Sequence, residues 1–373
     1  MQADERAAWL RLALTPGIGP VSARALLREF GLPGALFDGS VPRARLAEAA
    51  GEPAARALRG EPPREISAAL ERTERWLAEA PERFLLSLAD ADYPPGLLQL
   101  GDAPILLYGH GRRELLGMPA IAIVGSRGAT RQGAENAASF AACLGRAGLC
   151  IVSGMARGID AAAHRGALDA GCATIAVLGT GCDRVYPASH RALAAELASR
   201  GLLLTEFELG ARPLADHFPR RNRLIAALSR GVLVVEAALH SGSLITARIG
   251  AELGREVFAI PGSIHSPQAR GCHRLIRDGA KLVESAQDVL EELRWPMHPP
   301  APSGAAAADG PALQPGHARL LEAIGHDPAD IDTLCRRTAL DPGSVAAMLL
   351  ELELAGDVER VAGDRYQRLR ASR

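Results

Sequence analysis

The sequence has few cysteines, and their spacing suits neither disulfide nor metal chemistry. None of the six forms a CxxC pair: Cys143, Cys150, Cys172, Cys182, Cys272 and Cys335. This scattering indicates a reducing compartment and argues against a disulfide framework or a zinc site. No segment approaches the ~20 uninterrupted apolar residues that span a membrane. The charged start MQADERAAWL also lacks the apolar run of a signal peptide, so we expect a cytoplasmic protein.

An excess of charge of either sign is also missing. The chain has 42 lysines and arginines against 43 aspartates and glutamates, a formal net charge of −1. The whole molecule therefore does not attract a polyanion, and any nucleic-acid site has to be a local basic patch. Lysine is almost absent, since Lys281 is the single one and 42 − 1 = 41 basic residues are arginine. Genome composition explains that bias as simply as recognition does, and we favour composition.

The signatures of several enzyme classes are absent from the sequence. The chain has no GxGxxG dinucleotide fingerprint, no GxxxxGK[ST] phosphate loop, no GxSxG nucleophile elbow and no HExxH zinc motif. Cysteine and histidine are not spaced as metal ligands either. We therefore predict no catalytic residues, no cofactor and no metal site.

Composition divides the 373 residues into four parts. The segment WPMHPPAPSGAAAADGPALQPG, residues 295–316, is rich in proline, alanine and glycine and is typical of a flexible linker. Another boundary lies near residues 78–83, where helical sequence gives way to strand-like FLLSL. We predict a helical domain over residues 1–80, a central domain over 81–294, the linker, and a tail domain over 317–373.

Seven apolar runs alternate with amphipathic segments in the central domain. The runs are AIAIVGS (120–126), CIVSGMA (150–156), ATIAVLGTG (173–181), LLLTEF (202–207), GVLVVEA (231–237), EVFAIPG (256–262) and AKLVES (280–285). Each is continuously apolar, as expected of a strand covered on both faces. The alternation predicts an α/β fold with a doubly wound, mostly parallel sheet. Ligands of such sheets bind at the carboxyl ends of the strands, where the strand order reverses.

Glycines and hydroxyl residues follow the first, second and fifth runs, where helices are expected to begin. Free amides and the positive end of the helix dipole suit such places to phosphate, and an arginine adds a charged fork. The alternative is a set of tight turns with capping residues such as Thr130 and Asp160. The candidate phosphate contacts at these three ends are Gly125, Ser126, Arg127, Ser153, Gly154, Arg157, Ser241, Ser243 and Thr246.

The other strand ends carry an aromatic residue and acids. In GTGCDRVYP, residues 179–187, Tyr186 could stack on a base or pack against the sheet edge. We favour packing, since most aromatic residues at strand ends are structural. Glu206 and Glu236 could form a carboxylate pair or hold arginines in place, and we favour the second interpretation.

Three arginines fall within four residues of HFPRRNRLIAALSRGVLVVEA, residues 217–237. In a helix, Arg221 shares one stripe with the apolar residues three, four and seven positions later, which places it beside the strand ends. Cations oppose the positive end of the helix dipole, and a bound anion offsets that repulsion. We therefore predict that Arg220, Arg221 and Arg223 belong to a phosphate-binding rim.

Two alternatives remain open for this cluster. The arginines could form ion pairs with Asp216, Glu206 or Glu236, because surface pairing is common although weak. Asn222 between them could donate to a base or a sugar, or only fix the turn.

Taken together and in this order, the motifs resemble the DNA-processing protein A (DprA/Smf) family of bacterial single-strand DNA-binding proteins. The matching segments are VGSRGAT, SGMARGIDAAAHRGAL, GTGCDRVYP, FPRRNRLIAALSRGVLVVEA, SGSLITARIGAELGREVFAIPG and GCHRLIRDGAKLVES. The resemblance implies an extended Rossmann-like domain, a homodimer and single-stranded DNA bound at the strand ends. It also implies protection of that DNA and its delivery to RecA recombinase in natural transformation or recombination, without catalysis.

The resemblance also assigns residues. The DNA contacts that it implies are Gly125, Ser126, Arg127, Ser153, Gly154, Arg221, Asn222, Arg223 and Ser243. The chain departs from the family after Tyr-Pro of the third strand end, where the family usually has a Lys or Arg that touches DNA. Ala188 stands there, and Arg184, His190 or Arg191 could compensate.

The flanking regions are similar to outer domains of the same family. TPGIGPVSARALLREFG, residues 15–31, resembles a helix-hairpin-helix in a small SAM-like helical domain, and its turn could meet DNA phosphate or only pack. The tail has three helical segments and a hairpin with Gly363-Asp364 at its turn, which predicts a winged helix. The third helix, SVAAMLLELELAG, carries only acids, which argues against major-groove recognition and favours a protein partner.

Two other functions stay open. Phosphoribohydrolases of the lysine-decarboxylase-like group act on nucleoside monophosphates, but they carry PGGxGTxxE where this chain has SGSLITA without a matching acid. The helix-hairpin-helix and winged-helix domains could instead bind double-stranded DNA. We favour a non-enzymatic single-strand binder that tolerates sequence, depends steeply on salt and gains from base stacking.

Overall fold

The computed structural model describes residues 2–296, 315–325, 328–361 and 363–368. The chain forms two compact units, residues 1–296 and residues 297–373, and each is described by itself. The helices predicted as a separate N-terminal domain belong to the first unit together with the sheet. Most of the predicted linker, residues 297–314, lies outside the described residues.

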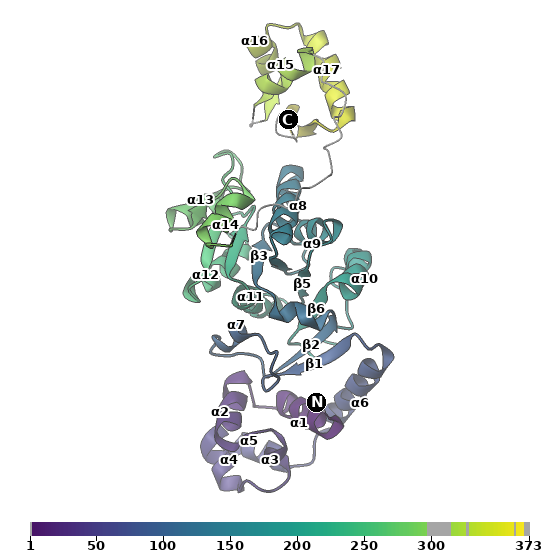
Figure 1. Ribbon diagram of the computed structural model, residues 1–373, viewed down its shortest axis with the longest axis vertical. Coiled ribbons are helices and arrows are strands. Elements are labelled where there is room, and N and C mark those ends of the chain that lie inside the picture. The colour runs from purple at the N-terminus through teal and green to yellow at the C-terminus, as the bar shows by residue number, and fades with distance from the viewer. Residues whose placement is uncertain (1, 297–314, 326–327, 362, 369–373) are drawn as a thin grey trace. The chain divides into compact units, whose positions relative to one another are not determined.

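A nine-stranded sheet forms the centre of the first unit (Figure 1). Its strands are β1 Arg83–Ser87, β2 Leu106–Gly111, β3 Ala120–Val124, β4 Cys150–Ser153, β5 Thr174–Val177, β6 Leu202–Thr205, β7 Gly231–Val234, β8 Glu256–Ala259 and β9 Lys281–Leu282. They lie in the order β1-β2-β6-β5-β4-β3-β7-β8-β9. Neighbouring strands are parallel from β6 to β9 in that order. Strand β2 runs antiparallel to both of its neighbours, β1 and β6. The chain moves outward from β3 to β6 and then returns to β7 on the other side of β3, so the strand order reverses there.

Each of the seven predicted runs contains a strand, and the doubly wound, mostly parallel sheet is confirmed. Strands β3 to β7 are buried along their whole length, in agreement with their continuously apolar sequences. The sequence did not predict β2, whose segment LLYGHG contains two glycines. One of them, Gly109, lies against β1, since a Cβ there would be 2.1 Å from the Phe84 ring. Contact with a neighbouring strand therefore outweighs weak local strand propensity.

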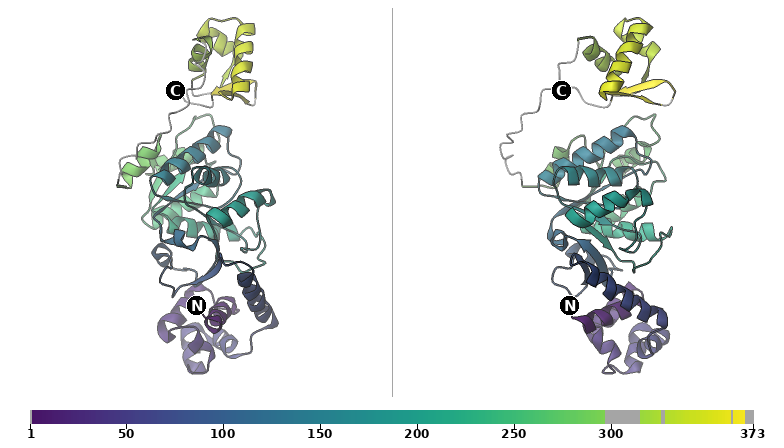
Figure 2. Two further views of the ribbon diagram at one scale, coloured as in Figure 1. Left: turned by 45° about the vertical axis from the view of Figure 1, so that its right-hand side comes forward. Right: turned by 90° about the vertical axis from the view of Figure 1, so that its right-hand side faces the viewer.

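Helices cover both faces of the sheet (Figures 1 and 2). One face carries α8 Arg131–Arg146, α9 Ile159–Asp169, α10 Arg191–Arg200 and α14 Ala286–Glu292. The other carries α7 Pro95–Leu98, α11 His217–Leu228, α12 Ser243–Glu252 and α13 Arg270–Arg277, and the short 3-10 turns are η1 Arg113–Gly117 and η2 Ala188–His190. Alternate residues of β3 serve the two cores, with Ile121 and Ile123 toward α8 and Ala122 toward α11.

The N-terminal helices join the core on the α10 side of the sheet. They are α1 Ala3–Leu14, α2 Pro20–Phe30, α3 Gly34–Phe37, α4 Arg43–Ala50, α5 Glu52–Arg59 and α6 Arg64–Glu79. The Trp76 ring of α6 lies edge-on to Tyr108 of β2, with 6.2 Å between the ring centroids. In the predicted Gly-Ile-Gly turn, Ile18 is buried and packs into this core. Shared apolar packing therefore makes these helices and the sheet one unit.

The second unit is a winged helix, as the sequence predicted. Its elements are α15 Pro315–Ile324, β10 Ala329–Asp330, α16 Ile331–Thr338, α17 Pro342–Ala355, β11 Val358–Val361 and β12 Arg365–Arg368. The β11–β12 hairpin turns at Gly363 and Asp364, both with positive φ.

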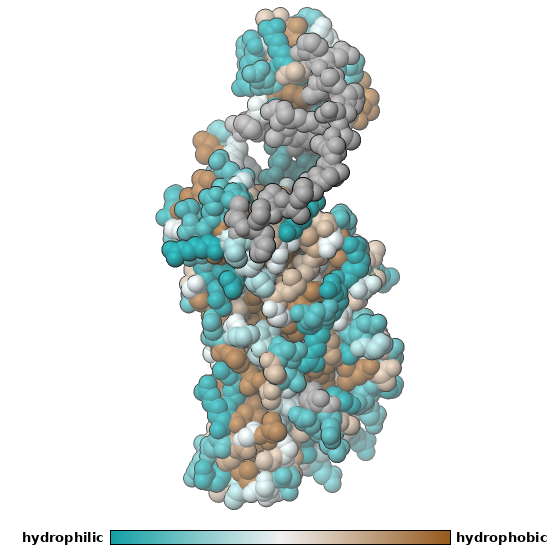
Figure 3. Space-filling view, viewed as in Figure 1, coloured by the Kyte–Doolittle hydropathy of each residue, from teal (hydrophilic) through white to brown (hydrophobic). Residues whose placement is uncertain are grey.

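On the face of the molecule drawn in Figure 3, polar and apolar residues are interspersed. Within the described residues, no helix has the length and apolar character needed to cross a membrane.

The crossing of α8 and α9 provides a test of this packing. Gly166 lies inside α9, and a Cβ there would come within 2.3 Å of the Ala138 carbonyl oxygen in α8. We expect Gly166→Ala to separate the two helices and to lower the free energy of unfolding by about 1–3 kcal/mol, although alanine favours a helix on its own. Gly34→Ala is the control, because no atom lies within 4 Å of its added Cβ. Urea denaturation compares the variants, and an unchanged midpoint for Gly166→Ala would contradict the close contact.

Candidate nucleic-acid interface

A cavity of about 630 Å³ lies at the carboxyl ends of β3 and β7, where the strand order reverses. We call it the switch-point pocket. The turn after β3, the loop after β7 and the first turns of α11 and α12 line it. The charged side chains that line it are Arg127, Asp160 and Arg221. His240 also lines it. This is the position at which ligands of doubly wound sheets bind.

The turn after β3 is held by backbone contacts on both sides. The Ser126 amide donates to the Glu236 carbonyl oxygen at 2.7 Å, and the Ile159 amide donates to the Ser126 carbonyl oxygen at 3.2 Å. Ser126 Oγ accepts from the Gly128 amide at 3.2 Å. These bonds fix the backbone on either side of Arg127, which is exposed at the pocket.

Side chains of the protein engage part of the N-terminus of α8. Thr130 Oγ1 accepts from the Gly133 amide at 2.9 Å, as a capping residue should. The Glu236 carboxylate accepts from the Thr130 amide at 3.0 Å and from its hydroxyl at 2.5 Å. A protein carboxylate therefore lies at this helix end, beside the place where the sequence predicted a phosphate.

Arg221 lies at the floor of the pocket, with 4% of the residue exposed. Its Nη1 donates to the carbonyl oxygens of Gly154 and of Val177, the latter at 2.7 Å. A Cβ at Gly154 would lie 1.9 Å from Nη1, which explains a glycine at that position. The guanidinium therefore ties α11 to the ends of β4 and β5.

Asp160 balances part of this buried charge. Burial lowers the pKa of Arg221 to about 10, and Asp160 opposes that shift, so the guanidinium stays protonated at neutral pH. The expectation that Asp160 caps α9 is wrong, because Gly158 holds the N-cap position. The Asp160 carboxylate instead accepts from the amides of Gly154 and Ala156, both at 3.2 Å, and closes the turn after β4. Burial raises the pKa of Asp160, and the charge of Arg221 counteracts this.

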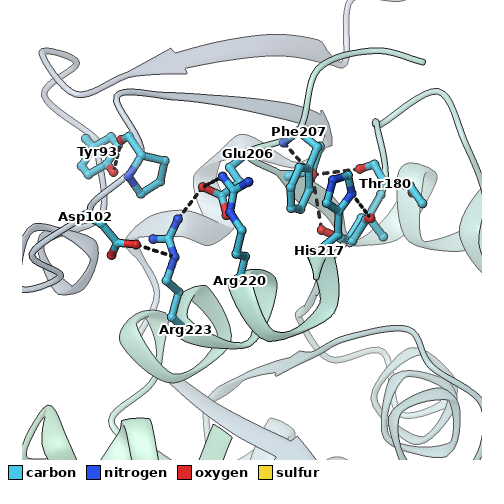
Figure 4. A network of polar contacts seen from close by, with 12 residues as sticks. Tyr93, Asp102, Thr180, Glu206, Phe207, His217, Arg220 and Arg223 are labelled. Atoms are coloured by element: carbon cyan, nitrogen blue, oxygen red, sulfur yellow. Dashed lines mark hydrogen bonds and ion pairs between the residues drawn. The ribbon is translucent and has the colours of Figure 1, made fainter. Parts of the chain in front are cut away.

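Arg220 and Arg223 point away from the pocket, toward the end of β6 (Figure 4). Arg223 forms ion pairs with the buried carboxylate of Glu206 and with Asp102, the latter at 3.2 Å. Arg220 lies 3.6 Å from Glu206 and 5.1 Å from the centroid of the Phe207 ring. The three arginines therefore do not form one rim, and the ion-pairing alternative describes Arg220 and Arg223. Glu206 holds arginines and Glu236 caps a helix, so these acids do not form a carboxylate pair.

Other predicted residues divide between the pocket and the scaffold. Ser241, Ser243 and Thr246 at the start of α12 line the switch-point pocket, and Asn222 also lines it. Asn222 Nδ2 donates to the Gly242 carbonyl oxygen at 3.3 Å, which joins α11 to this turn. Ser153 is buried and donates to the Ile123 carbonyl oxygen at 2.6 Å, so it links two strands instead of facing a pocket.

A second cavity of about 450 Å³, the side pocket, lies at the carboxyl ends of β4 and β5. Gly154, Arg157 and Ala188 line it. Arg127 and Phe218 line both pockets, and the Arg127 guanidinium lies 5.3 Å from the centroid of the Phe218 ring. These two side chains form the partition between the pockets.

Phe218 was not predicted from the sequence, and Tyr186 was predicted to pack but not to stay exposed. Phe218 stands one turn before the buried stripe of α11, a position that places it at the strand ends. Tyr186 packs against it with 5.6 Å between the ring centroids, as the packing interpretation expected. Yet Tyr186 remains 47% exposed and lines the side pocket, so it does not plug the sheet edge.

Comparisons with known proteins agree with this architecture. The family model for DNA recombination-mediator protein A matches residues 84–294. The chain belongs to the DprA/Smf family. The models for the DprA-like N-terminal HHH domain and the DprA winged helix domain match residues 3–68 and 304–364. The resemblance seen in the sequence is thereby confirmed.

Individual DprA/Smf proteins match over most of their length. Protein Smf of Escherichia coli is 43% identical over 299 residues, which cover 79% of each chain. The structure of DNA processing protein A from Streptococcus pneumoniae matches with a TM-score of 0.67 and 38% identity, over 80% of this chain and 99% of that chain. The structure of DNA processing protein A from Helicobacter pylori, described for its single-stranded DNA binding mode, matches with a TM-score of 0.51 and 31% identity. It covers 56% of this chain and 95% of that chain.

The departure from the DprA/Smf pattern at Ala188 leaves an uncharged methyl group in the side pocket. Arg184 is exposed on the same loop, and Arg191 is exposed at the start of α10. His190 is buried, with Nδ1 3.0 Å from the Met155 carbonyl oxygen, so it cannot stand in for the missing cation. In the parts of the chain that the structure describes, no three His, Cys, Asp or Glu side chains gather as metal ligands.

The Glu206–Arg223 pair yields a prediction about stability and pH. Arg223→Met leaves a carboxylate that is 3% exposed without its main partner. An unpaired buried charge costs about 3–5 kcal/mol, and we expect a loss of that order at pH 8. Burial raises the pKa of Glu206, so the folded variant binds a proton that the unfolded chain releases, and its stability falls as the pH rises above about 4.5. Urea denaturation should therefore show a smaller loss at pH 5 than at pH 8.

The control is the double variant Glu206→Gln/Arg223→Met. It contains no buried carboxylate at this position, so the difference between pH 5 and pH 8 should disappear. A loss in Arg223→Met that does not change with pH would contradict the pairing.

Proposed function

We propose that this protein binds single-stranded DNA in the switch-point and side pockets, without catalysis, and delivers it to a RecA-type recombinase during transformation or recombination. The observation that carries the proposal is the position of Arg127. Its exposed guanidinium stands on a fixed turn, lies over the Phe218 ring and separates two pockets at the switch point of the sheet.

Positive charge that is free to meet phosphate supports the proposal. Many arginines of this unit pair with acids, but within the described residues neither Arg127 nor Arg157 forms an ion pair. Both are exposed and line the pockets, and the buried charge of Arg221 lies beneath them. Phosphates bound here would release counterions, which makes binding steeply dependent on salt.

Aromatic faces support a single strand as the ligand. Phe218 lines both pockets and Tyr186 lines one. Bases stack on aromatic side chains only where they are unstacked from their own neighbours, and such stacking tolerates any sequence. The Helicobacter pylori relative, described for its single-stranded DNA binding mode, supports the same ligand class.

The acids near the pockets support a role without catalysis. Asp160, the acid that lines the switch-point pocket, is engaged with two backbone amides. Glu206 and Glu236 are engaged with arginines and with Thr130. A hydrolytic reaction needs a carboxylate or another base that can reach a water molecule, and these carboxylates are committed to the fold.

A homodimer is part of the proposal, and the far edge of the sheet supports it. Within the described residues β9 pairs only with β8. A groove of about 530 Å³ beside it contains Leu239 and Leu282, which are 39% and 44% exposed. The other residues that line it are Pro261, Arg270, His273, Ile276 and Arg277. An open strand edge next to apolar side chains suits contact with a second copy. Delivery of DNA to a recombinase places this dimer in the cytoplasm.

The winged helix has a different proposed role, in contact with a protein. The charged side chains of α17 are Glu351 and Glu353, and both are exposed. Leu350 and Leu354 on the same helix are 57% and 81% exposed. Acids repel the phosphate backbone, whereas exposed leucines suit an apolar partner surface.

The DNA site is tested by removing one charge from the partition. We expect Arg127→Ala to weaken binding of a labelled oligo-dT about tenfold, which corresponds to about 1.5 kcal/mol for one charged hydrogen bond. The slope of log affinity against log salt should become shallower by about 0.7 for one phosphate contact. Fluorescence anisotropy across a salt series, with a duplex of equal length in parallel, measures both quantities.

Arg131→Ala is the matched control for this variant. It removes the same charge from an exposed arginine of α8 that pairs with Glu135 and lines neither pocket. Equal binding of single strand and duplex by the wild type, or equal effects of the two variants, would refute the placement of the DNA site.

Truncation tests whether the second unit takes part in DNA binding. A chain ending at Pro296 keeps the first compact unit whole, together with both pockets. We expect its affinity for oligo-dT to lie within about twofold of the full chain, since α17 offers no positive charge. A fall of tenfold or more in the anisotropy titration would show that the winged helix binds DNA.

A further inference from the structure

The turn of residues 126–130, which carries Arg127 between β3 and α8, is bound at both ends by the same residue. The Ser126 amide donates to the Glu236 carbonyl oxygen at 2.7 Å. At the other end, the Thr130 amide and hydroxyl donate to the Glu236 carboxylate at 3.0 and 2.5 Å. The main chain and the side chain of Glu236 therefore fix the two ends of the turn, and Arg127 is exposed between them.

The start of α8 is shaped around the Glu236 side chain. Gly133 lies in the first turn of this helix, and a Cβ there would be 2.3 Å from Glu236 Cδ. Glycine destabilises a helix relative to alanine, but here it leaves the room that the carboxylate fills. The positive end of the helix dipole favours a carboxylate at this position.

The middle of the turn is held by longer bonds than its ends. The Gly128 amide donates to Ser126 Oγ at 3.2 Å, and Gln268 Nε2 donates to the Gly128 carbonyl oxygen at 3.4 Å. The shorter bonds at both ends belong to Glu236. The conformation of the turn therefore depends chiefly on this one acid.

Two effects of Glu236 on DNA binding oppose each other. A carboxylate near Arg127 repels a phosphate, so its charge alone weakens the binding of a polyanion. A turn that already has its bound conformation loses less entropy when it binds, which strengthens binding. Glu236 lines neither the switch-point pocket nor the side pocket, so a phosphate in the pockets meets Arg127 and not this acid.

We propose that Glu236 is a positioning residue for DNA binding, because its carboxylate holds the turn of residues 126–130 and presents Arg127 to a phosphate. The inference rests on the proposed function and deepens it. Glu236 does not touch the DNA and acts through Arg127. Its ordering of the turn outweighs its repulsion of the phosphate, so the net effect of this acid on a polyanionic ligand is favourable.

The test compares Glu236→Ala and Glu236→Gln in the full chain by fluorescence anisotropy with labelled oligo-dT. Both variants lose the charge, but glutamine keeps an oxygen that accepts from the Thr130 amide. We expect Glu236→Ala to bind about fivefold more weakly, the cost of ordering about one side chain. Glu236→Gln should stay within about twofold of the wild type. If both variants bind equally and more tightly than the wild type, repulsion is the main effect and the proposal is wrong.

Gly133→Ala tests the same contact without removing the acid. The added methyl group has to move the carboxylate, although alanine favours the helix. We expect oligo-dT binding to weaken about fivefold at unchanged charge. Glu135→Ala is the control, because it removes an exposed acid of α8 that pairs with Arg131, and it should stay within about twofold. Wild-type affinity in Gly133→Ala would show that the contact is dispensable.

A double-mutant cycle separates positioning from a general structural role. If Glu236 acts through Arg127, its loss has no further effect once Arg127 is gone. The variant Arg127→Ala/Glu236→Ala should therefore bind about tenfold more weakly than the wild type, as Arg127→Ala does. Independent effects would multiply to about fiftyfold. That result would overturn the proposal, because a general loss of stability acts in both backgrounds.

The outcomes separate this inference from the proposed function. If the wild type does not prefer oligo-dT to duplex, or if Arg127→Ala binds as the wild type does, the proposed function itself fails. If both results hold but Glu236→Ala keeps wild-type affinity, or adds in full to Arg127→Ala, the positioning role is refuted while single-strand binding stands.

Discussion

The buried guanidinium of Arg221 is the contact on which the geometry of the site depends. It joins α11 to the carboxyl ends of β4 and β5 through the carbonyl oxygens of Gly154 and Val177. A charge in this position is tolerated because Asp160 counteracts it and because carbonyl oxygens accept hydrogen bonds from the guanidinium. Since Phe218 precedes Arg221 by three residues, the same contact sets the partition between the two pockets.

The arginine cluster shows how one helix turn separates neighbouring side chains. At 3.6 residues per turn, residues three apart face the same side of a helix, whereas the two residues between them face other directions. Arg220 and Arg223 therefore reach Glu206 together, and Arg221 points to the strand ends. All three members of the cluster thus make contacts within the fold, and the accessible positive charge at the pockets comes from Arg127 and Arg157 in the turns after β3 and β4.

Most of the fold could be predicted from the sequence, but less of the site could. The apolar runs predicted strands β3 to β9, because a strand covered on both faces needs an apolar residue at nearly every position. Strand β2 was not predicted, because Gly109 within it is explained only by its contact with Phe84 on the neighbouring strand. At the candidate site, the predicted turns after β3, β4 and β7 line the two pockets, whereas Phe218 and the exposure of Tyr186 were not predicted. An exposed and a buried aromatic residue look alike in one sequence.

The sequence by itself determined the doubly wound sheet and the edge that carries the two pockets, because burial of apolar runs and the right-handed βαβ crossover follow from local pattern. Only the tertiary structure decided which charges remain free. Glu236 reaches Thr130, and Arg223 reaches Asp102, across stretches of chain whose pairing no local pattern predicts. Electrostatic attraction acts through space, so the fold, which brings distant residues within a few ångströms, selects the partners.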